Sequence, residues 1–279
     1  MLENITHATT GLTFGSLSVT PLSDGYLNIP AAYFPDLNPA DREKVSPATR
    51  FGANTWLIET SGRKILVDTG SGTALRDHFP ATGTLGWQAP EKTAERAAIT
   101  DIVITHMHAD HIGGLSHDGI SLFPNAEIHV QENEWDFWTD AGLLSRLPED
   151  RRPLAALIQA LAKPIRDQVN RHSGEAGLGD GLTLLPAPGH TPGHQIVHLS
   201  SGGKEALLLA DAVVSDVLQF ADPDIRYALD TDPGLAAETR KSLFGRIAAD
   251  GIPFAATHLN TTGFGHLTRR GSGYLFEQA

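Results

Sequence analysis

The chain has 279 residues, a formal net charge of −12 and no cysteine. Its length suffices for a large buried core, and 41% apolar with 19% charged residues is typical of a folded chain rather than a disordered one. The missing cysteines exclude disulfides, a cysteine nucleophile and thiolate metal sites, and the acidic charge argues against binding a nucleic-acid backbone.

The first half of the chain predicts strands and helices in alternation. Residues 1–50, rich in Pro, Asn and Asp, should form a short strand at 17–21 and otherwise irregular chain. The pattern then predicts strands at 54–60 and 64–68 joined by a Ser-Gly turn, and a helix at 91–99. After these we expect strands at 101–105 and 127–131, a helix beginning at 133, and a helix over 154–172 that Pro164 kinks or splits.

The second half repeats this alternation, with strands at 183–185, 195–199, 206–210 and 254–257 and a helix at 233–250. The alternation in both halves indicates an α/β fold. Because no linker interrupts the chain, we expect residues 1–279 to form a single domain, with 1–50 as an N-terminal extension packing on it. The N-terminus lacks the features of a secretory signal, and no apolar run approaches the ~20 residues of a membrane span. We therefore expect a cytoplasmic protein.

A His-x-His-x-Asp-His motif at residues 106–111 directly follows the apolar strand 101–105. Imidazole and carboxylate are the ligands that zinc, iron and manganese take from proteins. His106 and His108, two residues apart, would point the same way in an extended chain. Asp110 and His111 follow a bend and can face a second ion. The alternative is a polar loop with solvent-exposed histidines.

A second loop, Pro188 to His194, contains two Gly, two Pro and two His and follows the strand 183–185. Such a stiff loop suits a metal ligand, because ordering a flexible loop costs entropy. We expect His190 to be the ligand and His194 to pack or hydrogen-bond nearby. A Pro-Gly turn with incidental histidines is the alternative.

Two further strands end in a single polar residue. Asp211 closes the apolar strand 206–210, where a carboxylate needs a partner and can bridge two cations. A helix N-cap or turn is its alternative role. His258 closes the strand 254–257, and a lone histidine in such a place is more often structural.

These four features share one geometry, because each follows the C-terminal end of a short apolar strand, where open α/β sheets place their sites. Their number also suits two metal ions. We expect His106, His108 and His190 to hold one ion, Asp110, His111 and His258 to hold the other, and Asp211 to be shared.

The order of these residues resembles the metallo-β-lactamase superfamily. The resemblance extends from about residue 54 to the end and includes Val67-Asp68-Thr69-Gly70, residues 105–114 and the Gly-His-Thr-Pro-Gly-His loop. It implies an αββα sandwich with a dinuclear metal site at one edge. Stretches such as Phe123-Pro124-Asn125-Ala126 and Gln219-Phe220-Ala221-Asp222-Pro223 are similar to the methyl parathion hydrolase branch, which is related to the N-acyl homoserine lactonases.

The predicted enzyme is a dinuclear metal-dependent hydrolase whose metal-bridging hydroxide attacks a carbonyl carbon or a phosphorus. Asp110 and Asp211 would serve in catalysis as well as in metal binding. Asp68 would orient a ligand or the bridging water, with a strand-ending turn as its alternative role. The resemblance also implies a substrate pocket containing Trp138, which could instead be a core aromatic.

We expect the substrate to be a lactone or another small ester, ahead of an aryl phosphotriester. A glyoxalase II-type thioesterase is a further alternative, and a mononuclear iron oxygenase or a non-catalytic scaffold would be functions of another class. The complete set of seven ligands argues against the last two. The expected cofactors are two divalent metal ions, zinc first, with Mn, Co and Fe as alternatives. Neither nucleic acid nor membrane is an expected partner, and the resemblance implies a homodimer.

Overall fold

The computed structural model describes residues 11–45 and 49–278, which form two seven-stranded sheets and a small hairpin. In spatial order, the first sheet contains β1 (Leu12–Phe14), β2 (Leu17–Leu27), β3 (Phe51–Glu59), β4 (Lys64–Val67), β5 (Asp101–Val103), β8 (Glu127–Gln131) and β9 (Val169–His172). The second contains β10 (Ala176–Gly179), β11 (Leu182–Pro186), β12 (Gln195–Ser201), β13 (Lys204–Leu208), β14 (Phe254–Ala255), β15 (Gly265–Arg270) and β16 (Gly273–Gln278). The hairpin joins β6 (Ser116–His117) to β7 (Ile120–Ser121).

The two sheets pack against each other through an apolar layer. Alternate side chains of a strand point to opposite faces, so Trp56 and Ile58 of β3 reach the same layer as Val197 and Leu199 of β12. Leu208 of β13 lies in this layer too and is fully buried. At about 25 cal/mol per Å² of apolar surface removed from water, this layer is a main source of stability.

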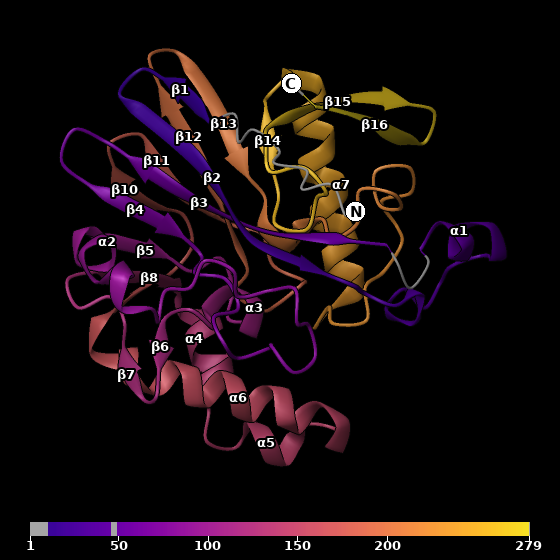
Figure 1. Cartoon of the computed structure of the whole chain (residues 1–279). Coiled ribbons are helices and arrows are strands. Elements are labelled where there is room, and N and C mark those ends of the chain that lie inside the picture. The colour runs from indigo at the N-terminus through magenta and orange to yellow at the C-terminus, as the bar shows by residue number, and fades with distance from the viewer. Residues whose placement is uncertain (1–10, 46–48, 279) are drawn as a thin grey trace, which may run out of the picture.

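Helices cover the outer faces of both sheets (Figure 1). On the first sheet, apolar residues of α4 (Glu132–Thr139), α5 (Leu143–Arg146) and α6 (Arg152–Ala162) form a second core cluster. On the second, α7 (Pro233–Asp250) contributes Phe244 and Ile247 to a third. The layers are therefore helix, sheet, sheet, helix, and the predicted αββα sandwich is confirmed.

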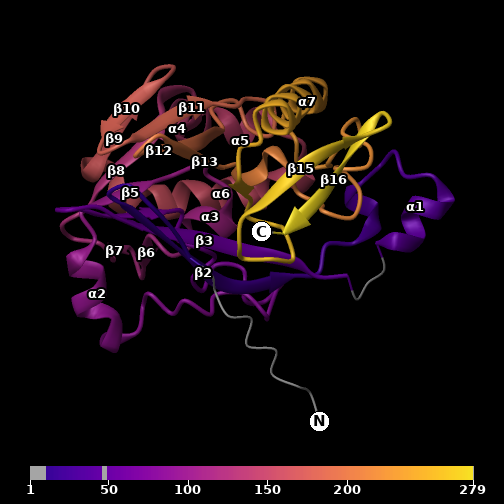
Figure 2. The ribbon, with the colours of Figure 1, turned by 90° about the horizontal axis from the view of Figure 1, so that it is seen from above.

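Shorter helices connect the strands. They are α1 (Pro39–Lys44), α2 (Thr93–Ala98), α3 (Ala109–Ile112) and the 3₁₀ turns η1 (Ala31–Tyr33), η2 (Pro90–Lys92), η3 (Glu149–Arg151), η4 (Lys163–Gln168) and η5 (Ala210–Ala212). In Figures 1 and 2, α1 lies at the periphery, away from the sheets. Among the described residues, no helix is both long and apolar enough to cross a bilayer.

Parallel pairing brings several strand ends to one place. β4 and β5 run parallel in the first sheet, and β13 and β14 run parallel in the second. Their C-terminal ends are followed by residues 68, 106, 211 and 258. Backbone hydrogen bonds then join the two sheets at this edge. The backbone N–H of Gln195 donates to the Thr105 carbonyl (2.9 Å), and the backbone N–H of Asn54 donates to the Thr257 carbonyl (3.0 Å).

Most predicted elements are present, with instructive differences. The strand at 127–131 and the helix at 233–250 have the predicted bounds. The strands predicted to reach 105, 210 and 257 end two residues earlier, because the chain turns there toward the polar cluster.

The predicted helix 154–172 is wrong at its end. After α6 and η4, residues 169–172 form β9, which pairs in parallel with β8. Residues 17–45 contain more regular secondary structure than predicted, since β2 continues to Leu27 and α1 follows. Strands β15 and β16 were not predicted. The single-domain interpretation of 1–279 stays a prediction, and residues 1–10 and 46–48 of its N-terminal extension lie outside the described residues.

Truncating Leu208 to alanine should lower the free energy of unfolding by about 2–5 kcal/mol, because it leaves a cavity between the sheets. Leu275→Ala is the matched control, since Leu275 is 41% exposed and should cost about 0.5 kcal/mol or less. Urea unfolding of both variants measures the difference. Equal losses would contradict this description of the core.

Candidate metal centre

Three histidine nitrogens converge in the interior at the edge where the two sheets meet. His106 and His108 follow β5, and His190 lies in the loop between β11 and β12. Nε2 of His190 lies 3.2 Å from Nε2 of His106 and 3.0 Å from Nδ1 of His108, and the latter two atoms are 3.1 Å apart. All three side chains are buried, so the predicted first set of ligands is brought together.

Asp211 lies between this group and the second predicted set. Its Oδ2 is 3.4 Å from Nε2 of His190 and 3.0 Å from Nε2 of His258, and its Oδ1 is 3.3 Å from Nε2 of His111. Asp110 completes the second set, with Oδ2 3.5 Å from Nε2 of His258 and 3.7 Å from Nε2 of His111. The structure therefore brings all seven predicted ligands together around one carboxylate, and their roles as ligands stay a proposal.

The second nitrogen of three of these histidines is held by an oxygen acceptor. Nδ1 of His111 donates to Oδ2 of Asp68 (2.8 Å), and Nδ1 of His258 donates to the carbonyl of Gly52 (2.7 Å). Nδ1 of His190 donates to Oδ1 of Asp230 (2.9 Å). Because the Nδ1–H of each ring is held by that acceptor, Nε2 is turned toward the cluster, where a metal ligand must point.

Two buried polar atoms in the described part of the cluster lack a hydrogen-bond partner and could be satisfied by a cation. Nε2 of His111 and Oδ1 of Asp211 face each other, yet neither has a hydrogen-bond partner. An unpaired buried polar atom costs about 1–3 kcal/mol. A divalent cation would satisfy both, and a donor set of imidazole and carboxylate without thiolate accepts Zn, Mn, Co or Fe. The residues therefore fit the implied metals.

Burial and Asp211 divide the histidines into two groups. Burial lowers the pKa of His106 and His108 well below the usual range, so both rings are neutral. Burial also disfavours the charged forms of His111 and His258, but Asp211 outweighs it and raises their pKa values. A cation taking the place of those protons would release them to solvent.

Asp68 behaves as the predicted orienting residue would. Besides His111, it accepts hydrogen bonds from the amide (2.9 Å) and hydroxyl (2.7 Å) of Thr105, immediately before His106. Its backbone has φ of 58°, in the left-handed region that aspartate tolerates better than most residues. It thus fixes the start of one ligand loop and one ligand ring, and its part in catalysis remains a proposal.

Sequence reasoning missed Asp230, Tyr227 and Glu134. Asp230 holds His190, and the ring of Tyr227 stacks on His190 with centroids 6.1 Å apart. Glu134 accepts hydrogen bonds from both histidine loops. Asp230 and Tyr227 come just before α7, where the local pattern signals only a helix start. Glu134 reads as an ordinary acidic residue in the first turn of a helix.

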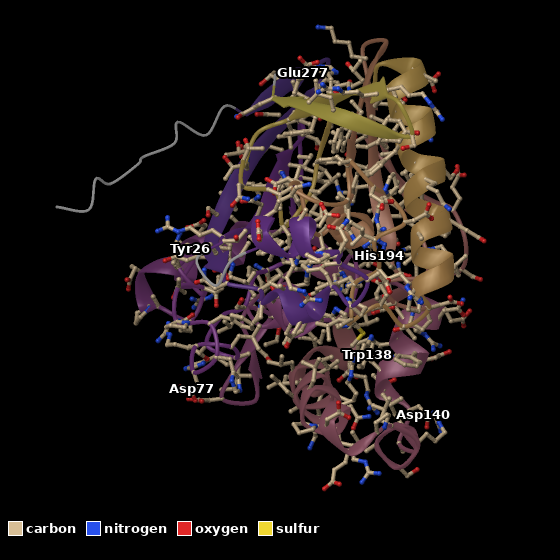
Figure 3. All side chains as sticks on the ribbon, turned by 90° about the vertical axis from the view of Figure 1, so that its right-hand side faces the viewer. Tyr26, Asp77, Trp138, Asp140, His194 and Glu277 are labelled. Carbon is tan, nitrogen blue, oxygen red and sulfur yellow. The ribbon has the colours of Figure 1, made fainter. Side chains whose placement is uncertain are left out.

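Trp138 and His194 contact histidines of the cluster, and Figure 3 labels both side chains. Trp138 is buried, and its ring meets His108 edge-on with centroids 5.6 Å apart. Among the described residues it does not line the cavity beside the site, so its place in a substrate pocket stays a prediction. His194 donates from Nδ1 to the Ala187 carbonyl (3.0 Å) and accepts at Nε2 from the Asp211 amide (3.2 Å).

A cavity of about 770 Å³ opens beside the cluster. His108 and Asp110 form part of its wall, and most of the rest is apolar or aromatic, including Leu27, Ile29, Tyr33, Phe79, Leu154, Leu157 and Tyr227. Burial raises the pKa of Tyr227 well above its usual range, and Asp110 adds to this effect. Its phenol is therefore protonated at neutral pH, and the cavity combines an apolar surface with phenol groups, that of Tyr227 among them, beside the cluster.

A family model described as the metallo-beta-lactamase superfamily matches residues 48–251. A probable metallo-hydrolase of Mycobacterium tuberculosis is 28% identical over 187 residues, 56% of this chain and 55% of that protein. An acyl-coenzyme A thioesterase of Gallus gallus is 30% identical over 158 residues, 52% of this chain and 53% of its own length. The chain thus spans about half the length of these curated relatives.

Among the solved structures that resemble the chain over nearly its whole length is AidC, described as a dizinc quorum-quenching lactonase in complex with the product N-hexanoyl-L-homoserine. The identity is 28% and the TM-score 0.85, covering 97% of each chain.

Acidification should unfold the metal-free protein partly through His194, because burial lowers the pKa of this histidine to about 3, against about 6.5 in an unfolded chain. Between these values the unfolded state binds a proton that the native state does not. The free energy of unfolding should therefore fall as pH falls, with His194 contributing up to about 1.4 kcal/mol per pH unit.

His194→Gln should make this decline shallower, and His117→Gln, on the partly exposed β6–β7 hairpin, should not. Urea unfolding in chelator at several pH values between 3 and 7 measures the slopes. Identical slopes in the wild-type protein and His194→Gln would contradict the assignment.

Proposed function

The chain belongs to the metallo-beta-lactamase superfamily, and we propose that it is a dinuclear metal-dependent hydrolase of lactones or other small esters. The observation that carries this proposal is the sharing of Asp211. Its two oxygens face different histidines, with Oδ1 on His111 and Oδ2 on His190 and His258. One carboxylate between two sets of ligand atoms is the arrangement that two neighbouring cations require.

The proposed sites divide the seven side chains into two sets with one shared member. When bound, divalent cations would acidify a coordinated water and polarise a substrate oxygen. His106, His108 and His190 would hold one, Asp110, His111 and His258 the other, and Asp211 both. Zinc is our first choice of metal, supported by the dizinc centre named for AidC.

The chain's own residues would then position the substrate and move protons. Hydrolysis of a lactone adds water to the carbonyl carbon, breaks the bond to the ring oxygen, and leaves that oxygen in need of a proton. Asp110 is the cluster carboxylate in the cavity wall, so we assign it this proton transfer. Tyr227, which also lines this cavity, would donate a hydrogen bond to a substrate oxygen.

The shape of the cavity favours a substrate with an apolar arm. A volume of about 770 Å³ lies within the usual range for small-molecule sites, and Leu154, Leu157 and Ile29 offer contacts to a hydrocarbon chain. The 28% identity to AidC over 97% of the chain adds support for a lactone. Aromatic wall residues such as Tyr33 and Phe79 could also pack on an aryl leaving group, so an aryl phosphotriester is the second candidate.

Metal content tests the dinuclear site. We expect two divalent ions per chain by elemental analysis, whereas a mononuclear oxygenase would hold one and a scaffold none. His108→Ala should lose one ion and lower kcat/KM on the order of 1,000-fold, because a missing ligand removes several kcal/mol of transition-state stabilisation. His198→Ala is the matched control, since His198 of β12 pairs with Glu205 of β13, outside the site. Two ions and full activity in His108→Ala would refute the assignment.

The substrate class can be tested on one zinc-loaded preparation with an acyl homoserine lactone, a dimethyl aryl phosphotriester and an acyl thioester. We expect a lactone kcat/KM of about 10⁴ M⁻¹s⁻¹ or more and values at least tenfold lower for the other two. A higher value for the phosphotriester would mean that the aromatic wall decides specificity. Weak values for all three would retain the metal centre and reject this substrate class.

A further inference from the structure

A buried carboxylate outside the proposed ligand set connects the two histidine loops. Glu134, in the first turn of α4, is fully buried. Its Oε1 accepts from the backbone amide of Met107 (2.8 Å), and its Oε2 accepts from the backbone amide of Gly193 (3.0 Å). Met107 lies between two ligand histidines, and Gly193 lies three residues after His190. One side chain therefore bonds to both loops that carry the His106–His108–His190 group.

The same carboxylate also fixes Trp138. The indole Nε1–H donates to Oε1 of Glu134 (2.8 Å), and the Trp138 ring packs edge-on against His108. Both Glu134 and Trp138 lie on α4. The helix therefore supports the three-histidine group through contacts with Met107, Gly193 and the ring of His108.

The loop containing Gly193 packs closely against α4. A β-carbon at position 193 would lie 2.3 Å from the backbone nitrogen of Glu134, so only glycine permits the loop to approach α4 this closely. The loop and the helix touch through backbone atoms as well as through the carboxylate. A displacement of α4 by a few tenths of an ångström would therefore move the loop that carries His190.

From this geometry we propose that Glu134 is a positioning residue, which sets the separation of the two histidine loops and thereby the affinity and coordination geometry of the first metal site. The inference rests on the metal centre of the proposed function. Glu134 does not line the described cavity, so its effect on catalysis is exerted through the loops and not through contact with substrate.

A carboxylate, with two acceptor oxygens, is the group that this position requires. Three N–H groups donate to it, those of Met107, Gly193 and Trp138, and the Thr191 side chain interacts with it as well. Glutamine has nearly the same shape but only one acceptor oxygen. If that oxygen keeps the two donors at the Oε1 position, the amide NH₂ faces the Gly193 N–H and repels it. Glu134→Gln should therefore release the His190 loop first.

Cobalt titration of the metal-free proteins tests the proposal without relying on turnover. Glu134→Gln should bind Co²⁺ at the first site about 10–100-fold more weakly than wild type, the range expected when a residue supporting a metal ligand is lost. The visible absorption of the bound ion should also change, because His190 shifts relative to His106 and His108. Glu134→Asp, too short to reach both loops, should weaken binding as well and serves if the glutamine variant does not fold.

Asp24→Asn is the matched control. Asp24, on β2, is also a buried carboxylate that accepts from backbone amides, those of Ser71, Gly83 and Leu85, and none of these is a proposed ligand. We expect this change to lower stability while leaving cobalt affinity and spectrum unaltered.

The outcomes separate the two proposals. If wild type binds no cobalt, the metal centre of the proposed function fails. If wild type binds two ions and the Glu134 variants bind them with the same affinity and spectrum, the positioning role is overturned. Equal weakening in Asp24→Asn and Glu134→Gln would also overturn it, because general loss of stability would then explain the effect.

Discussion

Burying seven ionisable side chains at one edge of the sandwich is the constraint on which the rest of the site depends. A polar group taken from water without a partner costs several kcal/mol, so each ring needs acceptors and each carboxylate needs donors. Asp68, Asp230 and the Gly52 carbonyl meet that need on the outer side of three rings. On the inner side Asp211 contacts several histidines at once, and the buried atoms of these seven side chains that lack a hydrogen-bond partner, Nε2 of His111 and Oδ1 of Asp211, face each other at the proposed metal centre.

The sandwich makes this burial feasible because its two sheets deliver polar residues from four strand ends to one place. The backbone turns that bring these residues together are locally strained. Asp68 and Ala210 have φ of 58° and 45°, a region that costs a non-glycine residue about 1–3 kcal/mol. Each adjoins the cluster, Asp68 on the Thr105 side and Ala210 directly before Asp211. Inter-sheet packing and the Gln195–Thr105 and Asn54–Thr257 hydrogen bonds hold these turns in place.

The features that could be predicted are those encoded by residues close together in the sequence. The 106–111 motif and single polar residues after apolar strands indicated the cluster, because strand ends converge in an α/β fold. Asp230 and Glu134 could not be found this way, since their partners are 40 residues (His190) and 27 residues (Met107) away in sequence. β9 was mistaken for helix for a related reason: its Val-Asn-Arg-His sequence has no strand periodicity, and pairing with β8 decides its conformation.

The chemistry and the proposed specificity reside in different parts of the fold. The ligand candidates come from turns anchored by the two sheets, whereas the cavity wall comes mainly from connecting segments: residues 27–33, 75–79, 150–157 and 227–229. Apart from 152–157, which belong to α6, these are loops and short turns, and such segments can change without moving the strand ends that carry the cluster. Tyr227 joins the two parts, since it lies in the cavity wall and stacks on His190. Substitutions of the wall residues should therefore change the substrate preference. Substitutions of the residues that support the ligand loops, Asp68, Asp230 and Glu134, should instead change metal binding.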